Sequence, residues 1–364
     1  MLLLLPLLLP QADGAWPLER PLDRILLVSV DGLRSDALLA ARPEELPAFR
    51  RILAGTSTLN ARPDPDLTLT LPNHTGILTT LPALGPGGHG WTRNDEPPAG
   101  ATLHDGAGRY LPGIFDRAHD HGLATGLFAG KSKFVLFDRS WDAEHGAADR
   151  TGTDDGRDKI DEFLVDRDPE VLVERALAAL RRRPRALVLL HLRQPDDAGH
   201  RDGWDLSDDS PYRRAVAAVD RLLGRVLADL EEQAGEGRRV GLILTADHGG
   251  GAPFRGHSAR RELWINAVIP LAVWSPCLPE GRDLYRSGGG RWTEPGIRVP
   301  GRSEPPPARN LDAGRIALEL LGLPPIHPVA FRPRESGTTE DPLPSNPETP
   351  GVERGPPSPG RGST

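Results

Sequence analysis

The stretch Ile25-Leu26-Leu27-Val28-Ser29-Val30-Asp31 decides the fold, because it has the composition of a buried strand and ends in a carboxylate. Further apolar runs occupy 123–129, 186–192, 240–246 and 267–274. Continuous apolar runs without polar alternation are typical of parallel strands that are covered on both faces. The pattern predicts an α/β fold with a mostly parallel central sheet and helices on both of its faces.

Helical segments are expected between these runs, from the spacing of their apolar residues and from their end signals. The expected helices are Glu44 to Ala54, Glu170 to Arg183, Tyr212 to Glu232 and Asp312 to Leu321. Residues 279–308 are rich in Pro, Gly and Arg, so we expect a long surface loop there.

The two ends of the 364-residue chain differ in composition from the rest. Residues 1–19 begin with an apolar stretch that is shorter than the roughly 20 residues needed to span a bilayer. This stretch resembles the core of a signal peptide and predicts a secreted or periplasmic protein, although it lacks a basic residue ahead of the apolar run. The alternatives are a mis-assigned start codon and a leader that is never cleaved. Residues 332–364 lack apolar periodicity and are predicted to form a disordered tail, which leaves 20–331 as one folded domain.

Charge and cysteine content exclude several classes of function. The net charge of -7 and the pI near 5.9 argue against a surface that binds nucleic acid. Cys277 is the single cysteine, so the chain has no intrachain disulfide and no cysteine-based zinc site. No transmembrane span is expected.

A hydroxyl stands beside a predicted helix start in the segment from Asp66 to Gly76. Pro72 suits the first turn of a helix, which places Thr70 just before the helix N-terminus, where backbone N–H groups favour an anion. A threonine at such a position commonly acts only as a cap. Thr70 becomes a candidate nucleophile if a metal lowers the pKa of its hydroxyl.

Aspartates and histidines follow the ends of three apolar runs, where their desolvation is costly unless something binds them. Any one of them alone is readily explained as a solvated carboxylate or a hydrogen-bonded imidazole. Together with Thr70 they supply seven oxygen or nitrogen donors, which exceed one tetrahedral shell but suit two ions about 4 Å apart. The six carboxylate and imidazole donors are Asp31, Asp196, His200, Asp247, His248 and His257.

Five segments together resemble the type I phosphodiesterase/nucleotide pyrophosphatase family of the alkaline phosphatase superfamily, in the order that the family has. They are Val30-Asp31-Gly32-Leu33-Arg34, Thr70-Leu71-Pro72-Asn73-His74, His89-Gly90 followed by Asn94, Pro195-Asp196-Asp197-Ala198-Gly199-His200 and Thr245-Ala246-Asp247-His248-Gly249.

The resemblance implies an alkaline-phosphatase-like three-layer α/β/α fold and a pair of zinc ions. It implies that Asp196, His200 and a third histidine hold one ion, and that Asp31, Asp247 and His248 hold the other. Thr70 would lie between the ions as nucleophile, and Asn94 would bind a phosphoryl oxygen. The third histidine is His257 or His327, and we favour His257 because the Gly-His-Ser segment ahead of the 268–274 run resembles a compact subgroup.

The expected activity is hydrolysis of phosphodiester or pyrophosphate bonds in a small-molecule substrate, through a phosphothreonine intermediate. The alternatives are a phosphomonoesterase or phosphonate hydrolase of the same superfamily, and a degenerate member that binds without catalysis. A sulfatase is not expected, because Thr70-Leu71-Pro72 occupies the place of the modifiable cysteine or serine. A segment at 126–132 falls one residue short of a phosphate-binding P-loop, although Lys131 or Lys133 could reach a substrate anion.

Overall fold

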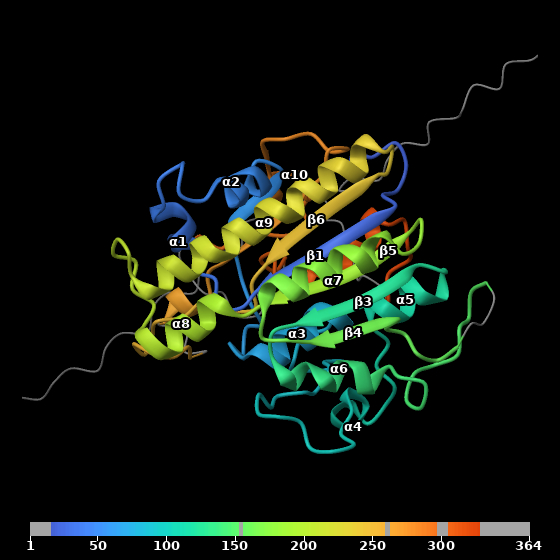
Figure 1. Ribbon diagram of the computed structural model, residues 1–364. Helices are drawn as coiled ribbons and strands as arrows, with labels where there is room; N and C mark the ends of the chain where they lie inside the picture. The colour runs from blue at the N-terminus through green and yellow to red at the C-terminus, as the bar shows by residue number, and fades with distance from the viewer. Residues whose placement is uncertain (1–15, 153–155, 259–262, 297–304, 328–364) are drawn as a thin grey trace, which may run out of the picture. The chain divides into compact units, whose positions relative to one another are not determined.

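Eight strands form one sheet in the order β4-β3-β5-β1-β6-β7-β2-β8, and Figure 1 labels the part of it from β4 to β6. The computed structural model describes residues 16–152, 156–258, 263–296 and 305–327. The strands are β1 (Arg24–Val30), β2 (Thr56–Ala61), β3 (Ala124–Ala129), β4 (Glu162–Val165), β5 (Ala186–Leu192), β6 (Val240–Thr245), β7 (Ile269–Trp274) and β8 (Arg282–Asp283). Among the described residues, β7 alone runs against its neighbours, β6 and β2. The predicted mostly parallel sheet is confirmed.

The register of the central strands brings their carboxyl ends level. Val30 of β1 lies opposite Leu192 of β5, and Ser29 of β1 lies opposite Thr245 of β6. All residues of these three strands are buried, which explains why each is a continuous apolar run. The segments that follow the three strands therefore emerge side by side at one edge of the sheet.

Helices cover both faces of the sheet, as the three-layer α/β/α prediction requires. They are α1 (Ser35–Ala40), α2 (Pro47–Leu53), α3 (Thr70–Thr79), α4 (Leu103–Ala107), α5 (Ile114–Asp120), α6 (Val135–Ser140), α7 (Pro169–Arg181), α8 (Gln194–Asp202), α9 (Pro211–Gly235), α10 (Leu284–Ser287) and α11 (Asp312–Leu320). In Figure 1, α7 and α9 cross the near face of the strands, while α3 and α5 lie behind them. Helix α11 packs against α3, α5 and β1.

The long helices begin where local side chains satisfy their first N–H groups. The Asp168 carboxylate accepts a hydrogen bond from the Glu170 N–H at the start of α7, and the Ser210 hydroxyl accepts one from the Arg213 N–H at the start of α9. A proline occupies the first helical position of both helices. These signals lie within a few residues of each helix start, so the sequence placed both helices well.

Three strands were not predicted. The polar strand β2 lacks a long apolar run, β4 is short and only partly buried at the sheet edge, and β8 has two residues. The expectation of a loop from 279 to 308 was wrong at residues 282–287, where β8 pairs with β2 and leads into α10. Strands at the edge of a sheet pair through backbone groups, so the pattern of their side chains gives little indication that they are strands.

Several expectations concern residues outside the described ranges. The apolar core of the leader falls within residues 1–15, and the tail comprises 332–364. Across the described part of the chain, no helix combines the length and apolar character needed to cross a membrane.

Candidate metal centre

The candidate site lies at the carboxyl edge of the central strands. Asp31 directly follows β1, Asp196 lies on α8 after β5, and Asp247 with His248 follows β6. All four side chains are buried, and Asp31, Asp247 and His248 are 0 % exposed. The turn after Asp31 needs Gly32, because its φ is +69° and a Cβ there would lie 2.9 Å from the Asp196 Cα.

Asp31, Asp247 and His248 form one cluster, which we call the inner trio. The His248 Nε2 lies 3.2 Å from the Asp247 Oδ2 and 3.7 Å from the Asp31 Oδ1. One donor atom from each residue falls within 4.8 Å of the other two. This spacing allows one ion to contact all three.

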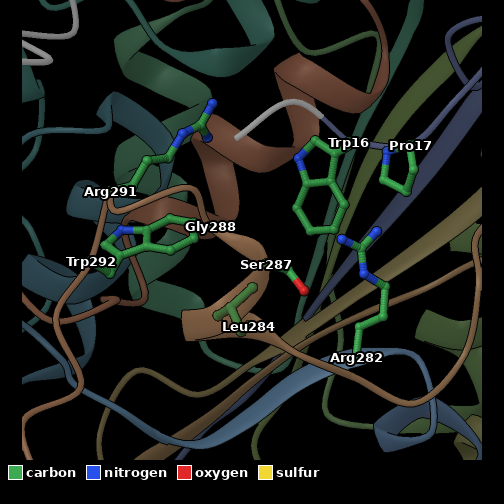
Figure 2. Close-up of a pocket in the computed structure, with 8 residues that line it drawn as sticks. All are labelled: Trp16, Pro17, Arg282, Leu284, Ser287, Gly288, Arg291 and Trp292. Atoms are coloured by element: carbon green, nitrogen blue, oxygen red, sulfur yellow. The ribbon is translucent and has the colours of Figure 1, made fainter. Parts of the chain in front are cut away.

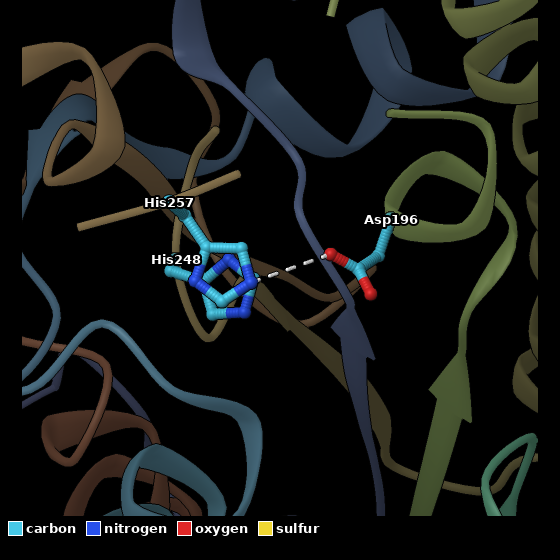
Figure 3. A group of neighbouring side chains, drawn as sticks. All are labelled: Asp196, His248 and His257. Carbon is cyan, nitrogen blue, oxygen red and sulfur yellow. Dashed lines mark ion pairs between the residues drawn. The ribbon is translucent and has the colours of Figure 1, made fainter. Parts of the chain in front are cut away.

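Asp196, His200 and His257 form a second cluster, the outer trio. The His200 Nε2 lies 3.4 Å from the Asp196 Oδ1 and 3.2 Å from the His257 Nε2. The His257 Nε2 lies 3.9 Å from the Asp196 Oδ1. The His257 side chain is 7 % exposed, whereas that of His200 is 46 % exposed. The two trios adjoin, because the His248 and His257 rings stack with centroids 3.8 Å apart (Figure 3). Asp196, His248 and His257 also satisfy the spacing for a shared ion.

Backbone carbonyls fix the tautomers of the three histidines. The Nδ1 of His248 faces the Gly249 oxygen at 2.8 Å, that of His200 faces the Arg255 oxygen at 2.9 Å, and that of His257 faces the Thr68 oxygen. A carbonyl oxygen can only accept, so each Nδ1 carries the proton and each Nε2 presents a lone pair. Metal-binding histidines are commonly held in this way.

Four buried acceptor atoms of the two trios are unpaired. In the described ranges, the buried atoms Asp31 Oδ1, Asp196 Oδ1, Asp247 Oδ2 and His248 Nε2 have no hydrogen-bond partner. The Nε2 lone pairs of His257 and of the solvent-exposed His200 also point at each other across 3.2 Å, and solvent reaches this pair. Lone pairs confronting one another in a buried space are unfavourable unless a cation lies between them. The donor set of carboxylate oxygens and imidazole nitrogens is one that zinc binds.

The protonation of the two inner carboxylates differs. Burial, followed by the charge of Asp31, raises the pKa of Asp247 to about 7. Burial also opposes ionisation of Asp31, but the Lys131 ammonium and a hydrogen bond from His191 hold its pKa well below the usual range. Burial and the neighbouring histidines lower the pKa of His257 to about 2, so its imidazole stays neutral. The raised pKa of Asp247 shows that the surrounding side chains do not fully compensate a second buried negative charge beside Asp31.

Lys131 joins the two trios to the candidate nucleophile. Its ammonium lies 2.6 Å from the Asp31 Oδ2, 2.6 Å from the Asp196 Oδ2 and 3.5 Å from the Thr70 Oγ1. The residue follows β3, the strand next to β5 in the sheet. The sequence suggested only that Lys131 could reach a substrate anion, and the structure adds its contacts with both carboxylates.

Thr70 and Asn94 meet at the start of α3. Thr70 is the first helical residue, where the sequence placed it one position before the helix, and Leu69 occupies the capping position without a side-chain cap. The Asn94 Oδ1 instead accepts a hydrogen bond of 3.0 Å from the Leu71 N–H. Both residues named as catalytic candidates therefore lie beside the same helix end.

His191 contacts the site, although the sequence assigned it no role. Its Nε2 lies 2.9 Å from the Asp31 Oδ2, while its Nδ1 accepts a hydrogen bond of 3.2 Å from the Gly130 N–H. The Nε2 therefore carries the proton and donates to Asp31. The available signal was a single imidazole inside the apolar run 186–192.

His327, the alternative third histidine, lies elsewhere. Its imidazole forms a hydrogen bond with the backbone of Thr79, at the opposite end of α3 from Thr70. Nine residues of helix separate the two ends by about 14 Å. The structure thus brings His257, and not His327, to the trios.

Trp204 is the packing element behind the outer trio. A Cβ added at Gly199 would lie 2.2 Å from the Trp204 ring, and one at Gly250 would lie 2.1 Å from it. The ring centroid is 5.1 Å from that of His200 and 6.2 Å from that of His257. The glycines next to the metal-ligand candidates therefore make room for the indole.

A small cavity and a groove lie elsewhere on the protein, and no residue of either trio lines them. A cavity of about 10 Å³, room for a single water, lies beside β8 and α10, with Trp16, Arg282 and Trp292 among its walls (Figure 2). A groove of about 420 Å³ lies between α1 and the start of α9, where Arg213 pairs with Glu45.

Comparisons with known proteins agree with the geometry. The sequence model of the type I phosphodiesterase/nucleotide pyrophosphatase family matches residues 25–272. Murine ectonucleotide pyrophosphatase/phosphodiesterase 5 is similar at 25% identity over 62% of this chain and 57% of that chain, with a TM-score of 0.41. This chain thus spans little more than half the length of that relative. A search of curated proteins finds no match.

Two further structures share the fold. A protein of the alkaline phosphatase superfamily from Vibrio parahaemolyticus is 12% identical over 83% of this chain and 67% of that chain, with a TM-score of 0.55. A putative sulfatase from Bacteroides thetaiotaomicron is 15% identical over 84% of this chain and 72% of that chain, with a TM-score of 0.54. The match of the family model includes both trios, Thr70 and Asn94. The chain therefore belongs to the type I phosphodiesterase/nucleotide pyrophosphatase family and has the alkaline-phosphatase-like α/β/α fold.

Proposed function

We propose that this protein is a two-zinc hydrolase that cleaves phosphodiester or pyrophosphate bonds of a small-molecule substrate through a phosphothreonine intermediate. The observation that carries the proposal is the set of buried, unpaired acceptor atoms in the two trios, which the Lys131 ammonium links to Thr70. Family membership supports hydrolysis, and metal dependence is typical of the family. Zinc, the count of two ions and the role of Thr70 are part of the proposal.

The inner trio would hold one zinc ion and the outer trio the other, with His257 as the third histidine. Such ions supply a lowered pKa at the nucleophile and stabilisation of the leaving oxygen. The Thr70 hydroxyl gives its proton to water, and its oxygen attacks phosphorus in line. The threonine phosphoester forms as the bond from phosphorus to the leaving alcohol or phosphate breaks, and the leaving oxygen takes up a proton from water. Water then attacks the same phosphorus and restores the hydroxyl.

Other side chains bind the phosphoryl group and balance charge. The start of α3 directs N–H groups and its positive dipole end toward the reacting phosphate. The Asn94 amide donates to a non-bridging oxygen. Lys131, within 2.6 Å of two carboxylates, offsets the negative charge that gathers at the trios.

A second activity has one observation in its favour. Lys131 and Lys133 both reach this region, and their positive charge also suits a dianionic phosphomonoester or phosphonate. Comparing the rate of hydrolysis of bis-p-nitrophenyl phosphate with that of p-nitrophenyl phosphate distinguishes the diesterase activity from the monoesterase activity. Faster turnover of the monoester would favour the second activity. The complete set of trio residues argues against a degenerate binding protein.

Zinc analysis and one variant test the mechanism. The purified protein is expected to contain close to two zinc ions per chain. Thr70→Ala is expected to keep the zinc and to lose turnover, because it removes only the nucleophilic oxygen. A Thr70→Ala protein that hydrolyses the diester at the wild-type rate would exclude the phosphothreonine route, and less than one zinc per chain would exclude the two-ion site.

The proposal extends to the chain's organisation. We take 20–331 as the catalytic domain and 1–19 as a leader that directs export, with 332–364 as a tail without a catalytic role. Expression of the full chain in a bacterial host, followed by fractionation and N-terminal sequencing of the product, tests the leader. An uncleaved protein confined to the cytoplasm would contradict it.

A further inference from the structure

Lysine is rare in this chain, and its placement is informative. Only three of the 44 basic residues are lysines, Lys131, Lys133 and Lys159. Lys159 is buried against the Asp149 carboxylate, and Lys131 lies between Asp31 and Asp196. Surface positions thus carry arginine, while two of the three lysines place a compact ammonium among buried carboxylates. Lys133, the third, differs from both.

Lys133 directs its ammonium at a single residue. The Nζ lies 2.9 Å from the Asn94 Oδ1 and 3.2 Å from the Asn94 backbone oxygen. Within the described part of the chain, Lys133 forms no ion pair with a carboxylate. A partly buried ammonium without a counter-ion is an expensive arrangement, so its contact with Asn94 requires an explanation.

That contact determines how the Asn94 amide is oriented. The same Oδ1 accepts from the Leu71 N–H at 3.0 Å and from the Lys133 ammonium. Both partners can only donate, so the atom that faces them must be the oxygen and not the nitrogen. The amide NH₂ then points away from both donors, and in the described ranges it has no hydrogen-bond acceptor. The amide is held with its donors available, next to the residue that follows Thr70.

We propose that Lys133 is a positioning residue that locks the Asn94 amide so that its NH₂ is presented to a phosphoryl oxygen of the substrate. This inference rests on the proposed function, in which Asn94 binds that oxygen. Lys133 acts through Asn94 and does not itself contact the substrate. Without the ammonium the Leu71 N–H alone holds the oxygen, and the amide samples other orientations.

A double-mutant cycle tests the coupling. Lys133→Met is expected to lower kcat for bis-p-nitrophenyl phosphate about tenfold, the worth of one charged hydrogen bond, with little change in KM. In the Asn94→Ala background the same substitution is expected to have no further effect. A tenfold loss that persists in that background would overturn the proposal, because Lys133 would then act on the substrate directly.

Ser132→Ala is the matched control. The Ser132 hydroxyl contacts Glu96, so it links the same two segments without touching the Asn94 amide. Its kcat is expected to equal that of the wild type. If Ser132→Ala lowers kcat as much as Lys133→Met does, the effect comes from loosening the segment, and the proposal fails.

A spectroscopic measurement is independent of turnover. The chain has six asparagines, so selective ¹⁵N labelling gives few side-chain signals, and Asn94→Ala identifies the relevant pair. Lys133→Met is expected to shift and broaden that pair, and Ser132→Ala to leave it in place. An unchanged Asn94 signal in Lys133→Met would overturn the inference. If no phosphoester is hydrolysed at all, the proposed function fails, and the NMR result alone decides whether Lys133 orients the amide.

Discussion

Replacing Asp247 by asparagine is expected to stabilise the metal-free protein and to destabilise the zinc-loaded one. The Asp247 Oδ1 accepts from the Gly32 N–H at 3.1 Å and the His248 N–H at 2.9 Å, and an amide oxygen can keep both bonds. The Oδ2 faces the His248 Nε2 at 3.2 Å, where two acceptors oppose each other. An amide nitrogen in that place donates to His248 and removes the conflict.

The magnitude follows from the pKa of the carboxyl group. Burial raises the pKa of Asp247 from 3.8 to about 7, and each unit corresponds to about 1.4 kcal/mol. Because the folded state holds the proton more tightly than the unfolded state, stability is lost as the pH rises from about 4 through 7. At pH 8 the penalty in the metal-free protein is about 4 kcal/mol, an upper bound for what Asp247→Asn can recover.

Thermal unfolding at pH 8, with EDTA and with excess zinc, measures both effects. In EDTA, Asp247→Asn is expected to unfold at a higher temperature than the wild type, and at pH 4 this advantage should vanish. With zinc the order is expected to reverse, because binding to the folded state stabilises it by an amount that grows with the logarithm of the affinity and the amide is the poorer ligand. A variant that is less stable than the wild type in EDTA at pH 8 would refute the view of Asp247 as a strained carboxylate.

Two further predictions concern residues around the trios. His191→Asn removes the hydrogen bond that holds the Asp31 carboxylate, so zinc affinity, measured by chelator competition, is expected to fall about 10- to 100-fold; unchanged affinity would contradict that role. Gly250→Ala places a Cβ 2.1 Å from the Trp204 ring, so the free energy of unfolding in urea is expected to fall by about 1–3 kcal/mol. Gly224→Ala, on α9 with no heavy atom within 4 Å of the new Cβ, serves as control, and an equal loss there would remove the packing explanation.

The sequence predicted what is encoded locally. Strands β1, β5 and β6 are buried throughout, so each could be recognised in the sequence as an apolar run. The aspartates that follow these runs indicated where the site lies. The start of α9 was marked by its own cap, Ser210, and by Pro211. The start of α3 was placed one residue late because it has no local side-chain cap, and its Leu71 N–H is satisfied by Asn94, 23 positions along the chain.

The remaining features depend on the order and register of the strands. Lys131 reaches two carboxylates because β3 lies next to β5, which no property of β3 alone reveals. His191 meets Asp31 because Ser29 and Val30 lie opposite residues 191 and 192. The sequence also assigned His248 to the inner trio alone, whereas its ring stacks on His257 and adjoins both trios. The contact between His191 and Asp31 joins positions 160 residues apart, and that between Lys131 and Asp196 joins positions 65 apart.

The level ends of β1, β5 and β6 limit how this protein can change over evolutionary time. One residue inserted into any of these strands would shift the following ligand by about 3.3 Å and turn the rest of the strand to the opposite face. Insertions and deletions are therefore tolerated only where they leave this alignment intact, such as residues 95–102 between Asn94 and α4 or the turns at the opposite edge of the sheet. New substrate preferences in relatives of this chain are expected to arise by remodelling those segments around an unchanged set of strand ends.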